Sequence, residues 1–108
     1  MSILTGCGDN KPDDIRQEIW DEVKNRFLLL DKKMQQGEKL EANDFKQLTL
    51  FITKYNIEDL TISEKAILSA ISKMAIAKYN IDYNKSTEVD YKDYNFYKDK
   101  LKEIYNIK

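Results

Sequence analysis

Histidine is absent from this chain of 108 residues, and cysteine occurs once, at Cys7. Histidine is the commonest general base and one of the commonest metal ligands, so its absence argues against most hydrolase and zinc-site designs. A single cysteine can form no disulfide within the chain and, without histidine, no cysteine–histidine nucleophile. No glycine-rich phosphate loop is present either. We therefore expect a protein that is not an enzyme, with no cofactor and no metal site.

Residues that interrupt regular structure are also scarce. The chain has three glycines and one proline, and all but Gly37 fall within the first twelve residues. This composition predicts helices in the rest of the chain, because a sheet protein needs many tight turns. No apolar run approaches the roughly eighteen residues of a membrane-spanning helix. The 18 basic and 19 acidic residues give a net charge of −1, which argues against a nucleic-acid partner.

Apolar residues recur at the helical spacing in the first half of the chain. A first helix is predicted from Asp13 or Asp14 to Gly37, which would supply the left-handed residue that ends it. A second is predicted from Asn43 or Asp44 to Tyr55, with Asn43 as its expected N-cap. The first helix has one apolar stripe, formed by Ile15, Ile19, Val23, Phe27, Leu30 and Met34.

Two more helices are predicted in the second half. The segment Thr61-Ile62-Ser63-Glu64 has the form of a capping box and starts a helix that runs to Tyr79. A last helix is expected from about 90 to 105. The tripeptide Tyr-Asn-Ile occurs at 55–57, 79–81 and 105–107, and we interpret it as three similar helix ends with a left-handed asparagine.

These elements predict an all-α fold, a small antiparallel four-helix bundle of residues 13–108, preceded by a flexible tether at 1–12. The short connections at 37–42 and 56–61 suit antiparallel neighbours. The connection at about 80–89 is longer and polar, so we expect it to be the most mobile loop. Trp20 lies beside the apolar stripe of the first helix. We expect it to pack against a neighbouring helix and widen the core, and the alternative is that it marks a contact surface.

The polar connection carries a weaker alternative, a degenerate calcium loop. Its oxygen-bearing side chains fall at positions 1, 3, 5, 7, 9 and 12 of an EF-hand frame. Thr87 replaces the required glycine of that frame, and an aspartate replaces its last glutamate. An ordinary polar loop before a helix cap is therefore the favoured interpretation. The frame consists of Asp82, Asn84, Ser86, Glu88, Asp90 and Asp93.

The tyrosines suggest a contact surface. Six of the seven tyrosines fall in the last thirty residues, and they cannot all point inward on one helix. Aromatic side chains interleaved with charges are typical of protein interfaces. Tyr91, Tyr94 and Tyr97 are therefore candidate interface residues, and the alternative is that their rings are buried with the hydroxyls reaching water.

The segment Leu4-Thr5-Gly6-Cys7 resembles the lipobox of bacterial lipoproteins, and the polar residues that follow it suit a tether. That resemblance implies a diacylglycerol on Cys7, a location in the cell envelope and a membrane contact through the lipid. Only three residues precede the motif, so we expect Met1 to lie within a longer signal peptide. The function expected is protein binding by an inhibitor, an immunity or exclusion factor, or an assembly factor. The alternative is a cytosolic helical adaptor or regulator in which Met1 is the true start and Cys7 is incidental.

Overall fold

The computed structural model describes residues 11–84 and 88–107. Across these two ranges the chain forms helices and no strand, so the predicted all-α fold is confirmed. The short connection between the second and third α-helices contains one turn of 3₁₀-helix. The elements are α1 (Gln17–Gln36), α2 (Ala42–Thr53), η1 (Ile57–Asp59), α3 (Ile62–Tyr83) and α4 (Glu88–Tyr105).

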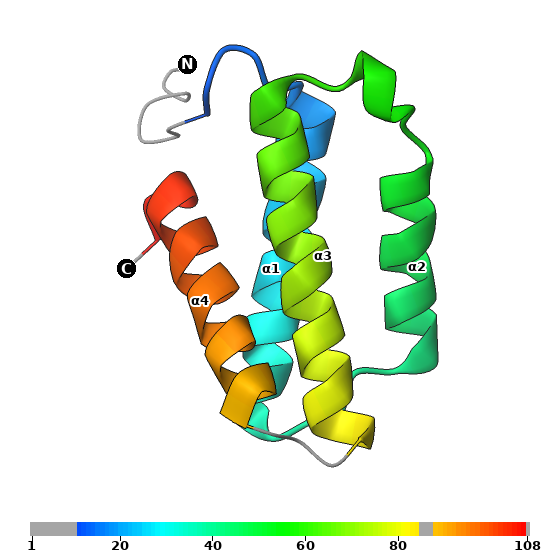
Figure 1. Cartoon of the computed structure of the whole chain (residues 1–108), viewed down its shortest axis with the longest axis vertical. Coiled ribbons are helices and arrows are strands. Elements are labelled where there is room, and N and C mark those ends of the chain that lie inside the picture. Colours follow the sequence, from blue (N-terminus) through cyan, green and yellow to red (C-terminus); the bar gives the residue numbers. More distant parts are fainter. Residues whose placement is uncertain (1–10, 85–87, 108) are drawn as a thin grey trace.

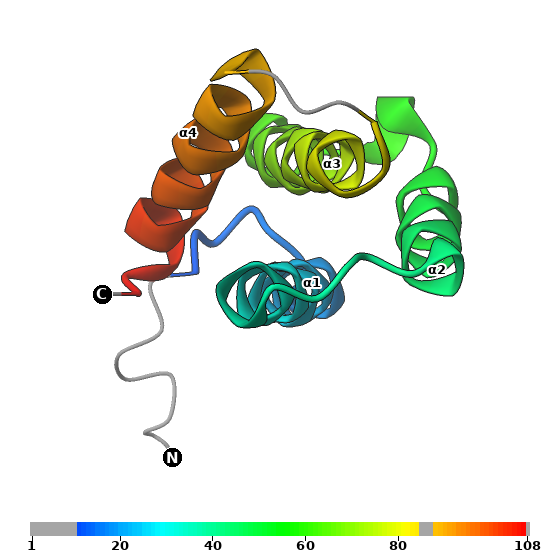
Figure 2. The same ribbon diagram turned by 90° about the horizontal axis from the view of Figure 1, so that it is seen from below.

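The helices form an up-and-down bundle in which consecutive helices run in opposite directions (Figure 1). Seen along the bundle, α1 and α3 lie at the centre, with α2 and α4 on opposite sides of them (Figure 2). The third helix contacts all three of the others, and α1 also contacts α4. Helix α3 is therefore the central element on which the bundle is assembled.

The core is built from the predicted stripe of α1 and the apolar face of α3. Trp20 is buried in this core, as predicted, and its ring stacks on Tyr105 with a centroid separation of 3.8 Å. The Tyr105 hydroxyl donates a hydrogen bond of 2.7 Å to the Trp20 carbonyl oxygen. On α3, the buried alanines at 70, 75 and 77 leave room for close approach of the neighbouring helices.

Helix α1 begins at Gln17, and the prediction of a start at Asp13 or Asp14 was wrong. The chain first makes a turn in which the Ile15 amide donates to the Pro12 carbonyl oxygen at 3.1 Å. Lys11 Nζ also donates to the Ile15 carbonyl oxygen at 2.8 Å. Lys11 and Pro12, the last residues of the predicted tether, therefore contact the start of the folded body, and Cys7 lies outside the described residues.

Two helices end in left-handed residues. After α1, Gly37 has φ 70°, and the Glu38 amide donates to the Lys33 carbonyl oxygen at 2.9 Å. After α4, Asn106 has φ 56°, and the amide that follows it donates to the Lys102 carbonyl oxygen at 2.8 Å. Both are Schellman ends. The predicted Tyr-Asn-Ile helix end is thus confirmed at 105–107.

The same prediction was wrong at the other two copies of the tripeptide. Residues 79–81 lie inside α3, which continues to Tyr83 because its last turn binds the chain segment before α2. At 55–57, α2 has already ended at Thr53, and Asn56 has an extended backbone with φ −73°. The Tyr-Asn-Ile tripeptide alone therefore does not determine that a helix ends with a left-handed asparagine.

Helix α2 is the least embedded of the four, and Leu48 is its one fully buried residue. Its N-cap is Glu41, two residues before the predicted Asn43, and the Glu41 amide donates to Asp44 Oδ2 at 3.2 Å. The acidic side chain at the third helical position therefore sets the start of the helix. No described helix has the length and apolar content needed to cross a bilayer.

Candidate functional site

A groove of about 430 Å³ lies between the end of α2, the η1 turn and α3. It has an apolar floor and walls, with hydroxyl groups and one ammonium group among the lining side chains. The apolar lining residues are Ile52, Tyr55, Ile57, Leu60 and Leu68, and the polar ones are Thr53, Lys65, Ser69 and Ser72.

The groove exists because α2 is shorter than the helix it packs against. Helix α2 has 12 residues and α3 has 22, so the chain leaves the surface of α3 at Thr53 and returns only at η1. Leu68 forms a buried floor, and Ile57 is an exposed rim residue. The volume falls within the range of about 300–1,000 Å³ that is usual for ligand pockets.

One wall of the groove has an unsatisfied polar atom. The hydroxyl oxygen of Tyr55 is buried and has no hydrogen-bond partner among residues 11–84 and 88–107. The guanidinium of Arg16 lies over the same ring, 5.0 Å from its centroid. A buried hydroxyl without a partner is unfavourable by about 1–3 kcal/mol, so the apolar wall is obtained at some loss of stability.

The starts of α1 and α3 are joined by an ion pair beside this groove. Glu64 is buried, and its Oε2 accepts from the Arg16 backbone amide at 2.8 Å and from Arg16 Nε at 3.0 Å. Its other oxygen accepts from the Thr61 amide at 3.0 Å, while the Glu64 amide donates to Thr61 Oγ1 at 3.1 Å, so the predicted capping box is confirmed. The hydrogen bond from the Arg16 guanidinium, chiefly, lowers the pKa of Glu64 to about 2.

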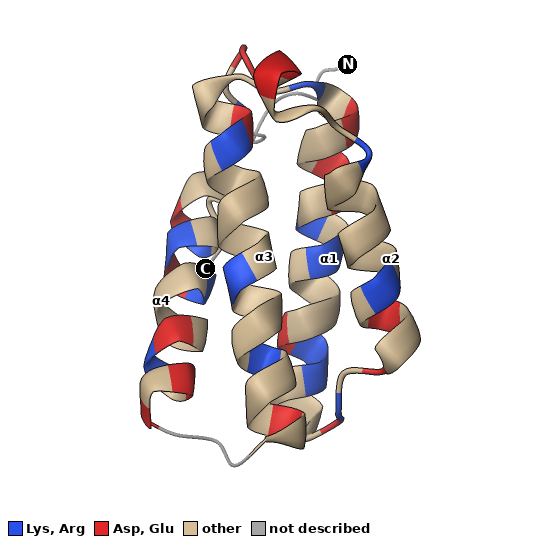
Figure 3. Cartoon of the chain, turned by 45° about the vertical axis from the view of Figure 1, so that its right-hand side comes forward, with Lys and Arg blue, Asp and Glu red and all other residues tan. Residues whose placement is uncertain are grey.

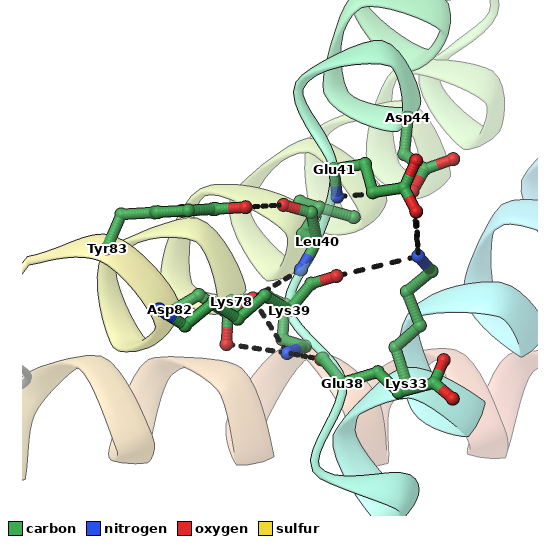
Figure 4. Close-up of polar contacts among 9 residues, drawn as sticks. All are labelled: Lys33, Glu38, Lys39, Leu40, Glu41, Asp44, Lys78, Asp82 and Tyr83. Carbon is green, nitrogen blue, oxygen red and sulfur yellow. Dashed lines mark hydrogen bonds and ion pairs between the residues drawn. The ribbon is translucent and has the colours of Figure 1, made fainter.

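At the opposite end of α3, a second ion pair holds the chain segment between α1 and α2 (Figure 4). The buried Lys78 Nζ lies 2.7 Å from both carboxylate oxygens of Asp82 and donates to the Glu38 carbonyl oxygen at 2.7 Å. Asp82 Oδ2 accepts from the Leu40 amide at 2.7 Å, and the Tyr83 hydroxyl donates to the Leu40 carbonyl oxygen at 2.6 Å. Six polar groups, three on the segment and three on α3, are satisfied in this way.

A neighbouring lysine extends this cluster to α2. Lys33 Nζ lies 3.0 Å from Asp44 Oδ2 and donates to the Lys39 carbonyl oxygen at 3.5 Å. The hydrogen bond to the Asp44 carboxylate raises the pKa of Lys33. All these charged groups have partners, so the two clusters position the chain and leave no free base or nucleophile.

The three candidate tyrosines do not form one surface. Tyr94 is only 2% exposed, and burial raises the pKa of its hydroxyl, so its assignment to an exposed interface is corrected. Tyr97 is half-buried beneath the ammonium of Lys73, 5.6 Å from the ring centroid. Tyr91 is exposed. The helical period turns Tyr94 toward the core because it shares a face with the buried Leu101.

The described residues do not form the loop that the calcium alternative requires. Asp82 lies within α3 and pairs with Lys78, while Asp90 and Asp93 lie within α4. Ser86 lies outside the described residues. Within residues 11–84 and 88–107, no group of three or more acidic, cysteine or histidine side chains could hold a metal ion. A twelve-residue loop is not formed, because α3 continues four residues beyond its predicted end.

Two features of the site were not predicted from the sequence: the buried ion pair of Lys78 with Asp82, and the groove between α2, η1 and α3. Lys78 and Asp82 are four residues apart, a spacing that is usual for exposed pairs on a helix surface. The sequence did contain a signal for the burial of Lys78, because this lysine continues the apolar face of α3 formed by Ile67, Ile71 and Met74. The groove had no such signal, since it depends on where α2 ends.

The exposed charges of the bundle are mixed in sign. Basic and acidic positions are interspersed along the helices, and neither sign dominates the face seen in Figure 3. Comparison of the chain with known protein families, with curated proteins and with solved structures finds no match.

Proposed function

We propose that this chain is a small bacterial lipoprotein, anchored in the cell envelope through a lipid on Cys7, that acts by binding another protein and not by catalysis. The groove between α2, η1 and α3 carries the proposal for binding. The resemblance of Leu4-Thr5-Gly6-Cys7 to a lipobox supports the anchor.

The lining of the groove favours an apolar segment of a partner protein. Ile52 and Leu60 offer apolar surface, and the hydroxyls of Ser69 and Ser72 lie on the α3 side. A partner helix or extended peptide could place apolar side chains in such a groove and polar groups at its edge. Burial of apolar surface would then supply most of the binding free energy.

The distribution of charge supports binding over catalysis. The buried ionisable side chains Glu64 and Lys78 are both held in ion pairs, and no histidine is available as a general base. Reactions that need acid–base or nucleophilic groups require such a group near a pocket. The charged side chain among those that line the groove, Lys65, is exposed to solvent.

Photo-crosslinking from the groove tests the binding proposal. A photoreactive amino acid is placed at Ser69, which lines the groove, and at the matched control Ala66, an exposed position of α3 that is not a lining residue. Expressed in the native cell, the chain should give an adduct of one defined mass from position 69 and none from position 66. Equal crosslinking from both positions, or none from either, would overturn binding through the groove.

Mass spectrometry of the mature protein tests the anchor. An acylated N-terminal Cys7 is expected, and a Cys7→Ser variant should lose both the lipid and the membrane fraction. An unmodified Cys7 combined with a retained crosslink from Ser69 would assign the chain to the cytosolic adaptor class instead. The two experiments therefore separate the location of the protein from its mode of action.

A further inference from the structure

The two most exposed large aliphatic side chains in the described part of the chain lie at one end of the bundle. Ile62 is 85% exposed and Ile57 is 68% exposed. Ile57 belongs to η1, in the connection from α2 to α3, and Ile62 is the first residue of α3. Both elements lie at the end where the chain enters the bundle (Figure 1). The Thr61 hydroxyl donates to the Asp14 carbonyl oxygen at 2.9 Å, so this connection is bonded directly to the entering chain.

The position of Cys7 in the sequence limits how far this end can lie from an anchor. Cys7 precedes Lys11 by four residues, and four residues span at most about 14 Å. Lys11 is fixed to the bundle by its hydrogen bond to the Ile15 carbonyl oxygen. A lipid on Cys7 would therefore hold the end that carries Ile57 and Ile62 close to the bilayer surface.

The charges around the two isoleucines show whether this end of the bundle can be attracted to a membrane electrostatically. Lys54 and Lys65 are matched by Glu58 and Asp59, and the entering chain adds Asp13 and Asp14; all six residues are exposed. A surface that binds by attraction to anionic lipids needs an excess of basic side chains. Contact of this end with a membrane would therefore depend on insertion of apolar side chains into the membrane–water interface, which does not require anionic lipid.

We infer that, in the lipid-anchored protein, the end of the bundle that carries Ile57 and Ile62 rests on the bilayer surface. This inference rests on the proposed acylation of Cys7. The occupant of the apolar end is the lipid surface, because the anchor places it there. The groove then opens beside the membrane, and the start of α4 points away from it.

Fluorescence quenching by brominated lipids tests this orientation. The full chain is coupled through Cys7 to a maleimide-bearing lipid in phosphatidylcholine vesicles that contain brominated acyl chains. A tryptophan is introduced as Ile62→Trp or, as a matched control, as Val89→Trp, which is 63% exposed at the other end of the bundle. We expect quenching at position 62 to be at least about threefold larger than at position 89, because bromine quenches only at short range.

The outcomes that overturn the inference are distinct. Equal quenching at positions 62 and 89, or none at 62, would show that this end is not held on the bilayer. A rise in quenching at 62 of more than about twofold when anionic lipid is added would show adsorption by charge instead. Adding Ile57→Asp to the Ile62→Trp protein should reduce the quenching while the helical circular dichroism signal is retained.

The vesicle experiment also remains separate from the test of the proposed function. The anchor is attached chemically, so failure of docking says nothing against acylation of Cys7 in the cell. Absence of that acylation would instead overturn the lipoprotein proposal, whatever the quenching result.

Discussion

The two ends of α3 hold their neighbouring chain segments with ion pairs of different kinds. At its start, the buried Glu64 pairs with Arg16, whose side chain is 43% exposed. Near its end, Lys78 and Asp82 are both buried, at 2% and 8% exposure. In the first pair the Arg16 guanidinium keeps its contact with water. In the second pair both charges are shielded from water and are compensated by protein groups.

This difference predicts different sensitivities to mutation. A buried charge that loses its partner keeps the full penalty of desolvation, whereas a half-exposed charge can return to water. The connection after α1 should therefore be the more fragile of the two attachments.

Replacement of Asp82 should have the largest effect. Asp82→Leu keeps the branched shape of the side chain but leaves the Lys78 ammonium buried without a countercharge and the Leu40 amide without its acceptor. We expect the free energy of unfolding to fall by about 3–5 kcal/mol, measured by urea denaturation.

The double variant Lys78→Met with Asp82→Leu is the control for this prediction. It removes both charges together and should recover part of the lost stability, because no ammonium is left unpaired, while the Leu40 amide and the Glu38 carbonyl oxygen still lack these partners. If the double variant were less stable than Asp82→Leu alone, the unpaired ammonium would not be the cause of the loss.

Glu64→Gln should have a smaller effect, a loss of about 2–3 kcal/mol in the same assay. The glutamine keeps one acceptor for the Thr61 amide but loses the ionic bond to Arg16. Arg16 can then be solvated. A loss larger than that of Asp82→Leu would contradict the ranking of the two ends.

The depressed pKa of Glu64 predicts a specific dependence on pH. Its ordinary value is 4.5 and its value in the folded chain is about 2. The ionised carboxylate therefore contributes stability above pH 4.5, and this contribution is lost as the pH falls toward 2. The difference in stability between the native protein and Glu64→Gln should shrink across that interval, and a constant difference would contradict the assignment.

Gly37→Ala should have the smallest effect. The glycine has φ 70°, and a β-carbon there would meet no other atom within 4 Å, so the penalty is purely conformational. We expect a loss of about 1 kcal/mol from thermal unfolding. Gly37→Asn is the matched variant, and it should lose less because asparagine tolerates left-handed backbone better than alanine does.

The fold was predictable because its signals are local. The stripe of α1, the capping box at Thr61 and the left-handed Gly37 each depend on residues within one or two turns. Four amphipathic helices with short connections then leave few arrangements besides a bundle.

The site was less predictable because it depends on contacts between distant segments. The start of α1 moves to Gln17 because the Arg16 amide binds Glu64, 48 residues away. The end of α3 moves to Tyr83 because Asp82 binds Leu40, 42 residues away. Neither partner can be identified from periodicity, and the groove arises where α2 ends relative to α3.

The contact between Trp20 and Tyr105 has a consequence for synthesis of the protein. The two residues are 85 positions apart, and the core around Trp20 closes only when the last turn of α4 docks. On the ribosome, helix α3 can already pack on the stripe of α1, but Trp20 lacks its covering ring until Tyr105 has been translated. A chain that ends before Tyr105 is therefore expected to expose Trp20 and to aggregate more readily than the full chain.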